Sequence, residues 1–231
     1  TFYPSKGKER LKSMIETRPD WCVSRQRVWG VPLPIFVNKK TKEILVDDDV
    51  FETIAKIYEK EGSDCWFSDD PQKFLGKKYK AEDFEKLSDI VEVWFDSGST
   101  HSFVLEKRKD LKWPASMYLE GSDQHRGWFH SSLLQSCGTR GKAPFESILS
   151  HGFVVDGKGL KMSKSLGNVI APEDILKKYG ADILRIWVAS SNYAEDLRID
   201  YSILDQHSES YRKIRNTFRY LLGNLNDNFE E

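Results

Sequence analysis

The sequence predicts an α/β fold: a doubly wound parallel sheet with a small inserted α+β module, followed by a helical segment. Three observations predict it. A strand pattern at 115–120 runs through a glycine turn into a helical pattern at 124–137, the order found where ligands bind at the carboxyl edge of a parallel sheet. A second strand pattern, at 145–155, leads into a glycine-hinged loop rich in lysine. Beyond residue 172, apolar residues recur at helical spacing.

Composition limits the class of protein. The chain has 231 residues, with 39% hydrophobic and 31% charged residues, which is typical of one or two folded globular domains. With 35 basic and 36 acidic residues there is no overall basic field, so any RNA contact has to come from a local patch. No apolar run has the length of a membrane span. The chain starts with Thr1 and has no signal-peptide pattern, so we expect a piece excised from a longer protein.

Three cysteines, Cys22, Cys65 and Cys137, stand far apart in the sequence. Their odd number and wide spacing favour a reducing compartment, the cytoplasm, over a disulfide framework. A lone Cys65 in the inserted module cannot form a zinc site, so we expect no zinc and no other protein-bound metal here.

The first 89 residues contain a helix, an extended segment and the inserted module. Leu11, Met14 and Ile15 have helical spacing within residues 1–20. Alternating prolines make 31–37 an edge strand or an extended segment. Residues 38–89 form the module, with a polar turn at 39–42, a helix at 50–58 and a loop at 62–71. Arg25 and Arg27, ahead of the module, are either surface charges or neighbours of a site.

The central part supplies the sheet. The β-branched and aromatic residues at 90–95 predict a buried strand. The helix at 124–137 is expected to bury one face, formed by Phe129, Leu133 and Cys137. The segment 145–155 is expected to be one strand, with His151 and Gly152 inside it.

Helices follow at 172–179, ended by Gly180, and at 181–189. A longer amphipathic helix is marked by Tyr211, Ile214, Phe218, Leu221 and Leu225. Its other face holds Arg212, Lys213, Arg215 and Arg219, which form either a solvated charged face or an RNA contact.

The loop at 154–168 is the strongest candidate for chemistry. Gly157 and Gly159 give it freedom to move, and Lys161 and Lys164 follow. Two lysines on such a loop can swing onto a polyphosphate and stabilise the charge that grows on departing pyrophosphate. The alternative is a solvated basic loop, since exposed lysines are the rule.

Three other residues have two interpretations each. Asp123, at the strand-to-helix junction, can accept both hydroxyls of a ribose or can act as a helix N-cap. Trp94 and Trp128 each lie beside polar residues, and each is either core or the wall of a ligand pocket.

Four blocks of sequence carry a family resemblance. Residues 161–165 read Lys-Met-Ser-Lys-Ser, and 120–128 read Glu-Gly-Ser-Asp-Gln-His-Arg-Gly-Trp. Residues 94–99 read Trp-Phe-Asp-Ser-Gly-Ser, and 21–30 read Trp-Cys-Val-Ser-Arg-Gln-Arg-Val-Trp-Gly. In their order and spacing these blocks resemble the class I aminoacyl-tRNA synthetases, and among them the isoleucyl family. The first signature of the class, of the His-Ile-Gly-His type, is absent from these 231 residues.

The resemblance implies the C-terminal half of a Rossmann-like catalytic domain at 1–37 and 90–165. It implies a connective-peptide module at 38–89, a stem-contact-like helical region at 166–205, and the start of a tRNA-contacting helical bundle at 206–231. It also implies ATP-dependent activation of isoleucine to isoleucyl-adenylate and transfer to tRNA(Ile). The fragment alone is expected to be inactive, because the first signature is missing.

Residue roles are carried over by the same resemblance. The catalytic pair would be Lys161 and Lys164. Glu120, Trp94 and Trp128 would bind the amino acid. ATP or adenylate would contact Gly121, Asp123, Gln124, His151, Gly152, Phe153, Val154, Met162, Ser163 and Ser165. Neither His125 nor His151 is needed as a general base, because an ionised carboxylate attacks the α-phosphate directly.

The implied cofactors are ATP and Mg²⁺ brought with the substrate. The implied partners are isoleucine, tRNA(Ile) and the rest of the same synthetase: its N-terminal signature half, editing domain and anticodon-binding domain. A monomer without membrane contact is expected. The competing hypothesis is a binding module for nucleotide or tRNA that performs no turnover, which the missing signature favours for the fragment.

Overall fold

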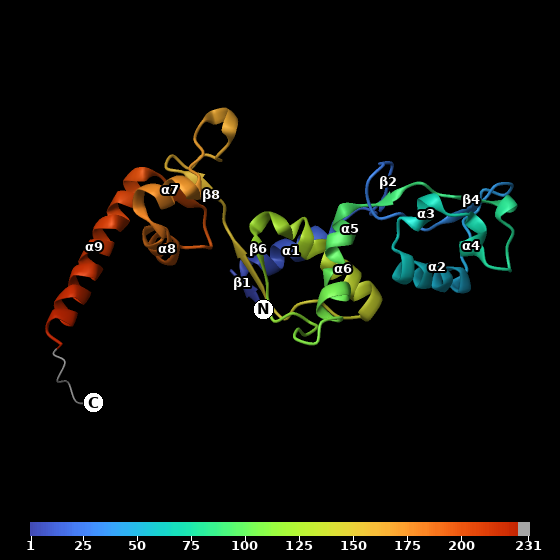
Figure 1. Ribbon diagram of the computed structural model, residues 1–231, viewed down its shortest axis with the longest axis horizontal. Helices are drawn as coiled ribbons and strands as arrows, with labels where there is room; N and C mark the ends of the chain where they lie inside the picture. The colour runs from blue at the N-terminus through green and yellow to red at the C-terminus, as the bar shows by residue number, and fades with distance from the viewer. Residues whose placement is uncertain (226–231) are drawn as a thin grey trace. The chain divides into compact units, whose positions relative to one another are not determined.

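A computed structural model describes residues 1–225 (Figure 1). The chain divides into two compact units. One contains residues 1–7, 117–123 and the chain from Ser147 onward, and the other contains 8–116 and 124–146. The last six residues of the predicted helical bundle lie outside the described part.

A three-stranded parallel sheet organises the first unit, with strand order β1-β7-β6. The strands are β1 (Phe2–Tyr3), β6 (Tyr118–Gly121) and β7 (Ile148–His151). Ile148 in the central strand is fully buried and lies opposite both Phe2 and Tyr118. Since the strands run parallel, β6 and β7 end at the same edge, where Gly121 is opposite His151. The predicted parallel sheet is confirmed.

The expected single strand at 145–155 is instead two strands. After β7 the chain breaks at Gly152 and continues as β8 (Val154–Asp156), which pairs in parallel with β9 (Leu197–Ile199). At this break the backbone bonds to the segment before β9: the Gly152 N–H donates to the Tyr193 carbonyl at 2.9 Å. The residues on both sides of Gly152 form strands, as their β-propensity predicts. The strand that each side pairs with depends on residues far away in the sequence, so no local pattern indicates the change of partner.

Helices α7 (Pro172–Tyr179), α8 (Ala181–Ser190) and α9 (Tyr201–Gly223) follow as predicted, with Gly180 ending α7. Figure 1 shows α7 and α8 beside the N-terminal end of α9. Ile175, Ile183, Trp187, Ile199 and Leu204 join the three helices to β9 in one core. The predicted amphipathic helix begins ten residues earlier than its first marker, Tyr211, so the expected boundary at 205/206 falls inside α9.

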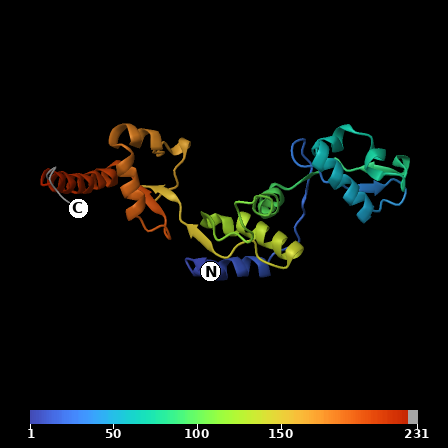
Figure 2. The same ribbon diagram turned by 60° about the horizontal axis from the view of Figure 1, so that its bottom comes forward.

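The second unit contains the inserted module, which has its own core. Strands β3 (Phe36–Asn38) and β4 (Phe84–Lys86) pair antiparallel. Figures 1 and 2 show α2 (Asp48–Glu61), α3 (Cys65–Ser68) and α4 (Pro71–Leu75) gathered around them. The predicted helix and α+β character are confirmed. The expectation of a plain loop at 62–71 is wrong, because α3 places Trp66 in the core between Phe36 and Phe74.

The rest of this unit corrects the expected strand at 90–95. Only β5 (Ile90–Val91) is extended, paired antiparallel with β2 (Ser24–Arg25), and α5 (Val93–Gly98) follows directly. The side chain of Glu92 causes the change, because it accepts the Trp94 N–H at 3.0 Å and caps the new helix. Also in this unit are most of α1 (Lys6–Glu16) and a π-helical turn at His101–Leu105.

Helix α6 (Trp128–Arg140) replaces the helix predicted at 124–137, and a 3₁₀ turn at Ser122–His125 precedes it. Phe129 is fully buried as expected, but Cys137 is exposed and Leu133 only half-buried. The buried face of α6 runs instead through Phe129, Ser132 and Ser136. Because serine is polar, the positions of Ser132 and Ser136 in the sequence suggest a solvent-exposed face, although both side chains are buried. No helix within residues 1–225 is long and apolar enough to cross a membrane.

Candidate active site

In the first unit, the carboxyl edge of the sheet gathers several of the predicted adenylate residues. Asp123 follows β6 by two residues and is exposed in the 3₁₀ turn. A Cβ placed on Gly121 would lie 2.7 Å from the Asp123 Oδ1 atom, so the carboxylate folds back over that glycine. Helix α6 begins at Trp128 with Gly127 as its N-cap, so Asp123 does not cap α6. Glu120 is exposed on the same strand, with Oε2 at 3.4 Å from the Gly121 N–H that donates to it.

The break between β7 and β8 provides a close backbone approach beside this edge. A Cβ on Gly152 would lie 2.2 Å from the Glu195 carbonyl oxygen, so no side chain fits there. The Phe153 N–H donates to Asp196 Oδ1 at 2.8 Å. Phe153 and Val154 are 50% and 42% exposed. An exposed apolar pair on a backbone fixed in this way can receive a flat aromatic ring.

His151 and His125 have local structural partners. The His151 Nδ1 atom lies 2.8 Å from the Gly152 carbonyl oxygen. In the second unit, His125 is buried and packs edge-on against Phe129, with ring centroids 5.5 Å apart.

The lysine loop follows β8 in the first unit. Lys161 and Lys164 are exposed, whereas Met162 packs against the core formed by α7, α8 and β9. The Ser163 hydroxyl accepts the Leu166 N–H at 3.3 Å and lies 3.1 Å from the Ser165 hydroxyl. Both ammonium groups therefore extend from a loop that is anchored by one methionine and by polar contacts.

Sequence reasoning missed Asp156, which stands at the start of this loop. Its Oδ2 atom accepts the side-chain N–H of Asn168 at 2.8 Å. This bond, more than any other contact, holds the pKa of the Asp156 carboxyl below its usual value, and the Leu160 N–H adds to the effect. The two residues are twelve apart, so no local pattern could have paired them.

The predicted pocket walls lie in the second unit. Trp94, on the first turn of α5, is 41% exposed, and Trp128 is half-buried at the start of α6. The Trp128 Nε1–H donates to the Ser97 carbonyl at 2.9 Å, which ties α6 to α5. A Cβ on Gly127 would lie 3.0 Å from the Trp94 ring, so the ring rests on bare backbone. Gln124 is also in this unit, where its Oε1 accepts the Trp128 N–H at 3.0 Å.

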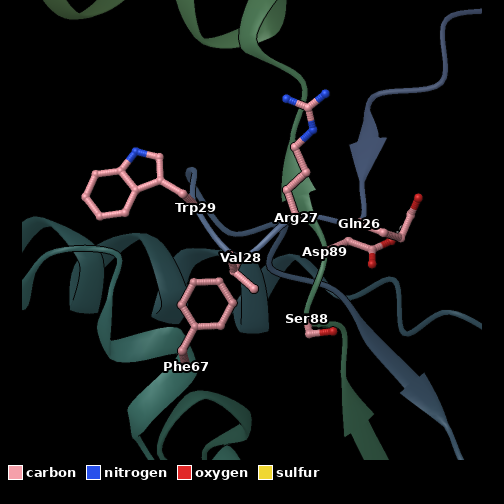
Figure 3. Close-up of a pocket in the computed structure, with 7 residues that line it drawn as sticks. All are labelled: Gln26, Arg27, Val28, Trp29, Phe67, Ser88 and Asp89. Carbon is pink, nitrogen blue, oxygen red and sulfur yellow. Dashed lines mark hydrogen bonds between the residues drawn. The ribbon is translucent and has the colours of Figure 1, made fainter.

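A separate pocket of about 860 Å³ lies in the second unit beside the segment that carries the two arginines (Figure 3). Exposed Arg27, Trp29 and Phe67 line it, together with Asp89, which accepts a hydrogen bond from Gln26 at 3.0 Å. Arg25 does not line this pocket. Its guanidinium donates to the Cys22 and Ser24 carbonyls at 2.6 and 2.8 Å. Among residues 1–225, no group of three or more His, Cys, Asp or Glu is arranged to hold a metal ion.

The fold is α/β, with a parallel sheet whose carboxyl edge carries several of the predicted residues. The family model described as tRNA synthetases class I (I, L, M and V) matches residues 1–200. The chain therefore belongs to the class I tRNA synthetases of this group.

Particular relatives are close. The chain is 87% identical over 230 residues to the isoleucine--tRNA ligase of Pelagibacter ubique, covering 100% of this chain and 25% of that protein. It is 55% identical over 231 residues to the isoleucine--tRNA ligase of Zymomonas mobilis, covering 100% of this chain and 24% of that protein. The chain thus spans about a quarter of the length of these relatives.

Solved structures agree in fold. A LeuRS of Agrobacterium radiobacter, in a ternary complex with tRNA and LeuAMS, matches with a TM-score of 0.63 at 20% identity, covering 91% of this chain and 30% of that one. The methionyl-tRNA synthetase of Mycobacterium tuberculosis, in complex with methionyl-adenylate, matches with a TM-score of 0.56 at 17% identity, covering 89% of this chain and 32% of that one.

Proposed function

We propose that this chain is the part of an isoleucine--tRNA ligase that holds the adenylate and the leaving pyrophosphate. The whole enzyme would join isoleucine to tRNA(Ile) in two steps, through isoleucyl-adenylate, using ATP. The observation that carries the proposal is the joint presence, in one unit, of a sheet edge with Asp123, a closely approached Gly152 and the two-lysine loop. The 87% identity to an isoleucine--tRNA ligase selects the amino acid.

In this mechanism the isoleucine carboxylate attacks the α-phosphate of ATP and pyrophosphate leaves. Asp123 would hold the ribose hydroxyls, with Gly121 allowing the approach, and Phe153 and Val154 would face the adenine. The Lys161 and Lys164 ammonium groups would stabilise the charge that grows on the departing phosphates. Half-buried Ser163 and exposed Ser165 would add hydrogen bonds, while Met162 holds the loop to its core.

Trp94 and Trp128 would form the walls for the isoleucine side chain, and Glu120 would attract its ammonium group. Mg²⁺ would arrive with the ATP phosphates, and no protein ligand is assigned to it. The exposed basic side chains of α9, at Arg212, Lys213, Arg215 and Arg219, would contact tRNA. Three unpaired cysteines favour a cytoplasmic enzyme.

A second candidate function is nucleotide or tRNA binding without turnover. It is favoured by one specific observation, the absence of a His-Ile-Gly-His pattern from the 231 residues. It applies to the chain taken alone, for which it predicts ligand binding without amino-acid-dependent ATP–pyrophosphate exchange.

The lysine loop is tested in a full-length enzyme. The chain is placed in the matching segment of the Pelagibacter ubique relative, and the product is called the chimeric enzyme. Lys164→Ala should slow single-turnover adenylate formation by about 10²–10³-fold, the usual effect of losing one preorganised charge donor. The apparent affinity for isoleucine should not change, because the loop contacts phosphate.

Lys177→Ala is the matched control, since Lys177 is an exposed lysine on α7 outside the loop. It should activate isoleucine at the wild-type rate. An unchanged activation rate in Lys164→Ala would show that the loop is solvated and has no role in the transition state.

A further inference from the structure

The lysine loop is closed at its base by one side-chain pair. Asp156 ends β8, and Asn168 ends the loop after the short 3₁₀ turn at Lys164–Leu166. The Asn168 Nδ2–H donates to Asp156 Oδ2 at 2.8 Å. We call these two residues the loop clamp.

Each member of the clamp also holds the backbone of the loop. Asp156 Oδ1 accepts the N–H groups of Lys158 at 3.0 Å and Leu160 at 2.8 Å. Asn168 Oδ1 accepts the Ser163 N–H at 2.9 Å, and its Nδ2–H also donates to the Lys161 carbonyl at 3.3 Å. The backbone is therefore fixed at Lys161 itself and one residue before Lys164, while both lysine side chains stay exposed.

Apolar packing leaves most of the loop unsupported. Leu160 and Leu166 are 54% and 66% exposed, and only Met162 reaches the neighbouring core. A loop with so little burial would sample many conformations unless polar contacts restricted it. Backbone bonds from the Asp156 N–H to the Leu160 carbonyl and from the Gly159 N–H to the Asp156 carbonyl supply part of that restriction. The clamp adds the side-chain contacts and leaves the lysine side chains free to meet a ligand.

We propose that Asp156 and Asn168 are positioning residues, which hold the backbone so that Lys161 and Lys164 point at the departing pyrophosphate. The inference rests on the proposed function of the loop. Neither clamp residue touches substrate in this account, and both act through the lysines. Misplacing a catalytic group by about 1 Å costs about 10²-fold in rate, so loosening the clamp should be visible in the activation step.

The chemistry of the pair allows a rescue experiment. Asp156→Asn places two amide groups opposite each other, and Asn168→Asp places two carboxylates opposite each other. The double variant Asp156→Asn/Asn168→Asp restores one donor and one acceptor with their roles exchanged. Its new carboxylate can still accept the Ser163 N–H, and its new amide oxygen can still accept from Lys158 and Leu160. Only the bond to the Lys161 carbonyl is lost, because a carboxylate cannot donate.

The three variants are made in the chimeric enzyme, with Asp174→Asn as control, because Asp174 is an exposed acid on α7 in the same unit. Single-turnover adenylate formation, KM for isoleucine and melting temperature are measured for each. Each single variant should slow activation by about 10–100-fold without changing KM for isoleucine or the melting temperature. The double variant should form adenylate at least tenfold faster than the slower of the two single variants. The control Asp174→Asn should match the wild-type rate.

A further variant separates positioning from a general effect. When Lys161 and Lys164 are both alanine, adding Asp156→Asn should slow activation by less than twofold, because the clamp then has nothing to position. An equal loss in both backgrounds would overturn the inference. So would single variants with wild-type rates, or variants that lower the melting temperature and isoleucine binding together and are not rescued by the exchange. If Lys164→Ala alone has no effect, the proposed function of the loop fails first; if Lys164→Ala slows activation and the clamp variants do not, only the clamp fails.

Discussion

At the residue scale, Trp128 connects helices α5 and α6 through one side chain. Its ring is half-buried beside Gly127, and its indole N–H ends on the Ser97 carbonyl. Sequence alone left Trp128 either as core or as a pocket wall. A side chain that joins two helices and keeps part of its ring accessible has features of both interpretations, so a substitution series is needed.

Trp128→Phe keeps an aromatic wall but removes the indole N–H and part of the ring, so it loses a hydrogen bond worth about 0.5–1.5 kcal/mol of stability together with some packing. Trp128→Ala removes the wall as well. In the chimeric enzyme it should weaken isoleucine binding by about 2 kcal/mol or more, roughly 30-fold in KM, while KM for ATP is kept. Steady-state exchange kinetics and melting temperature are measured together. Parallel loss of stability and of both substrates in Trp128→Ala would identify Trp128 as core.

Substitution of Gly152 tests the proposed nucleotide site, as substitution of Trp128 tests the amino-acid site. Because a Cβ there would meet the Glu195 carbonyl at 2.2 Å, Gly152→Ala must push the segment before β9 away, at a cost of about 1–3 kcal/mol. KM for ATP should rise while KM for isoleucine stays the same. Gly138→Ala is the control, since a Cβ on Gly138 in α6 meets nothing within 4 Å. A Gly152→Ala enzyme with wild-type KM for ATP would separate this glycine from the nucleotide site.

At the scale of helices and strands, sequence patterns correctly predicted the elements whose formation depends on residues close together in the chain. The helices at 172–179 and 181–189 were predictable because proline, glycine and apolar spacing all act within a few residues. The strand at 90–95 failed because one carboxylate, Glu92, caps a helix that β-branched and aromatic residues do not favour. The Asp156–Asn168 clamp lay beyond reach, since it depends on how the loop closes.

Helix α2 provides a test of the inserted module. Its N-cap, Asp47, accepts the N–H groups of Asp49 and Val50 and also bonds the Lys78 ammonium and the Tyr79 hydroxyl. Lys78 above all, and then Tyr79, lower the pKa of Asp47 from 3.8 to about 2. A lowered folded-state pKa means that the carboxylate stabilises the fold above pH 3.8 and loses this effect as the pH falls toward 2.

Asp47→Asn keeps a cap acceptor but removes the charge. At pH 6 it should lower the urea midpoint of the 231-residue chain, followed by circular dichroism, and this difference should shrink as the pH falls from about 4 to 2. Asp48→Asn, next to it in the first turn of α2, is the control for removing a charge without these partners. A difference that is constant with pH would mean that the Lys78 and Tyr79 contacts do not stabilise the charged form.

At the scale of the whole molecule, the sequence identified the family and the parallel sheet because four motifs lie in a fixed order. The molecule distributes the predicted residues over both units. Asp123, Gly152 and the lysines belong to one unit, and Trp94, Trp128 and Gln124 belong to the other. In the proposed function, activation also needs the His-Ile-Gly-His signature that the 231 residues lack. Positioning of such groups accounts for about 7–11 kcal/mol of a barrier, so a partial site should be catalytically silent.

We expect this chain to supply the pyrophosphate loop and the amino-acid pocket of an isoleucine-activating enzyme. Amino-acid-dependent ATP–pyrophosphate exchange tests it most directly, measured for the chimeric enzyme and for the purified 231-residue chain with isoleucine, leucine and methionine. The account predicts exchange by the chimeric enzyme with isoleucine far above the other two, and none by the chain alone. A chimeric enzyme that is silent or prefers leucine or methionine would contradict the claim, and exchange by the chain alone would show that its own residues replace the missing signature.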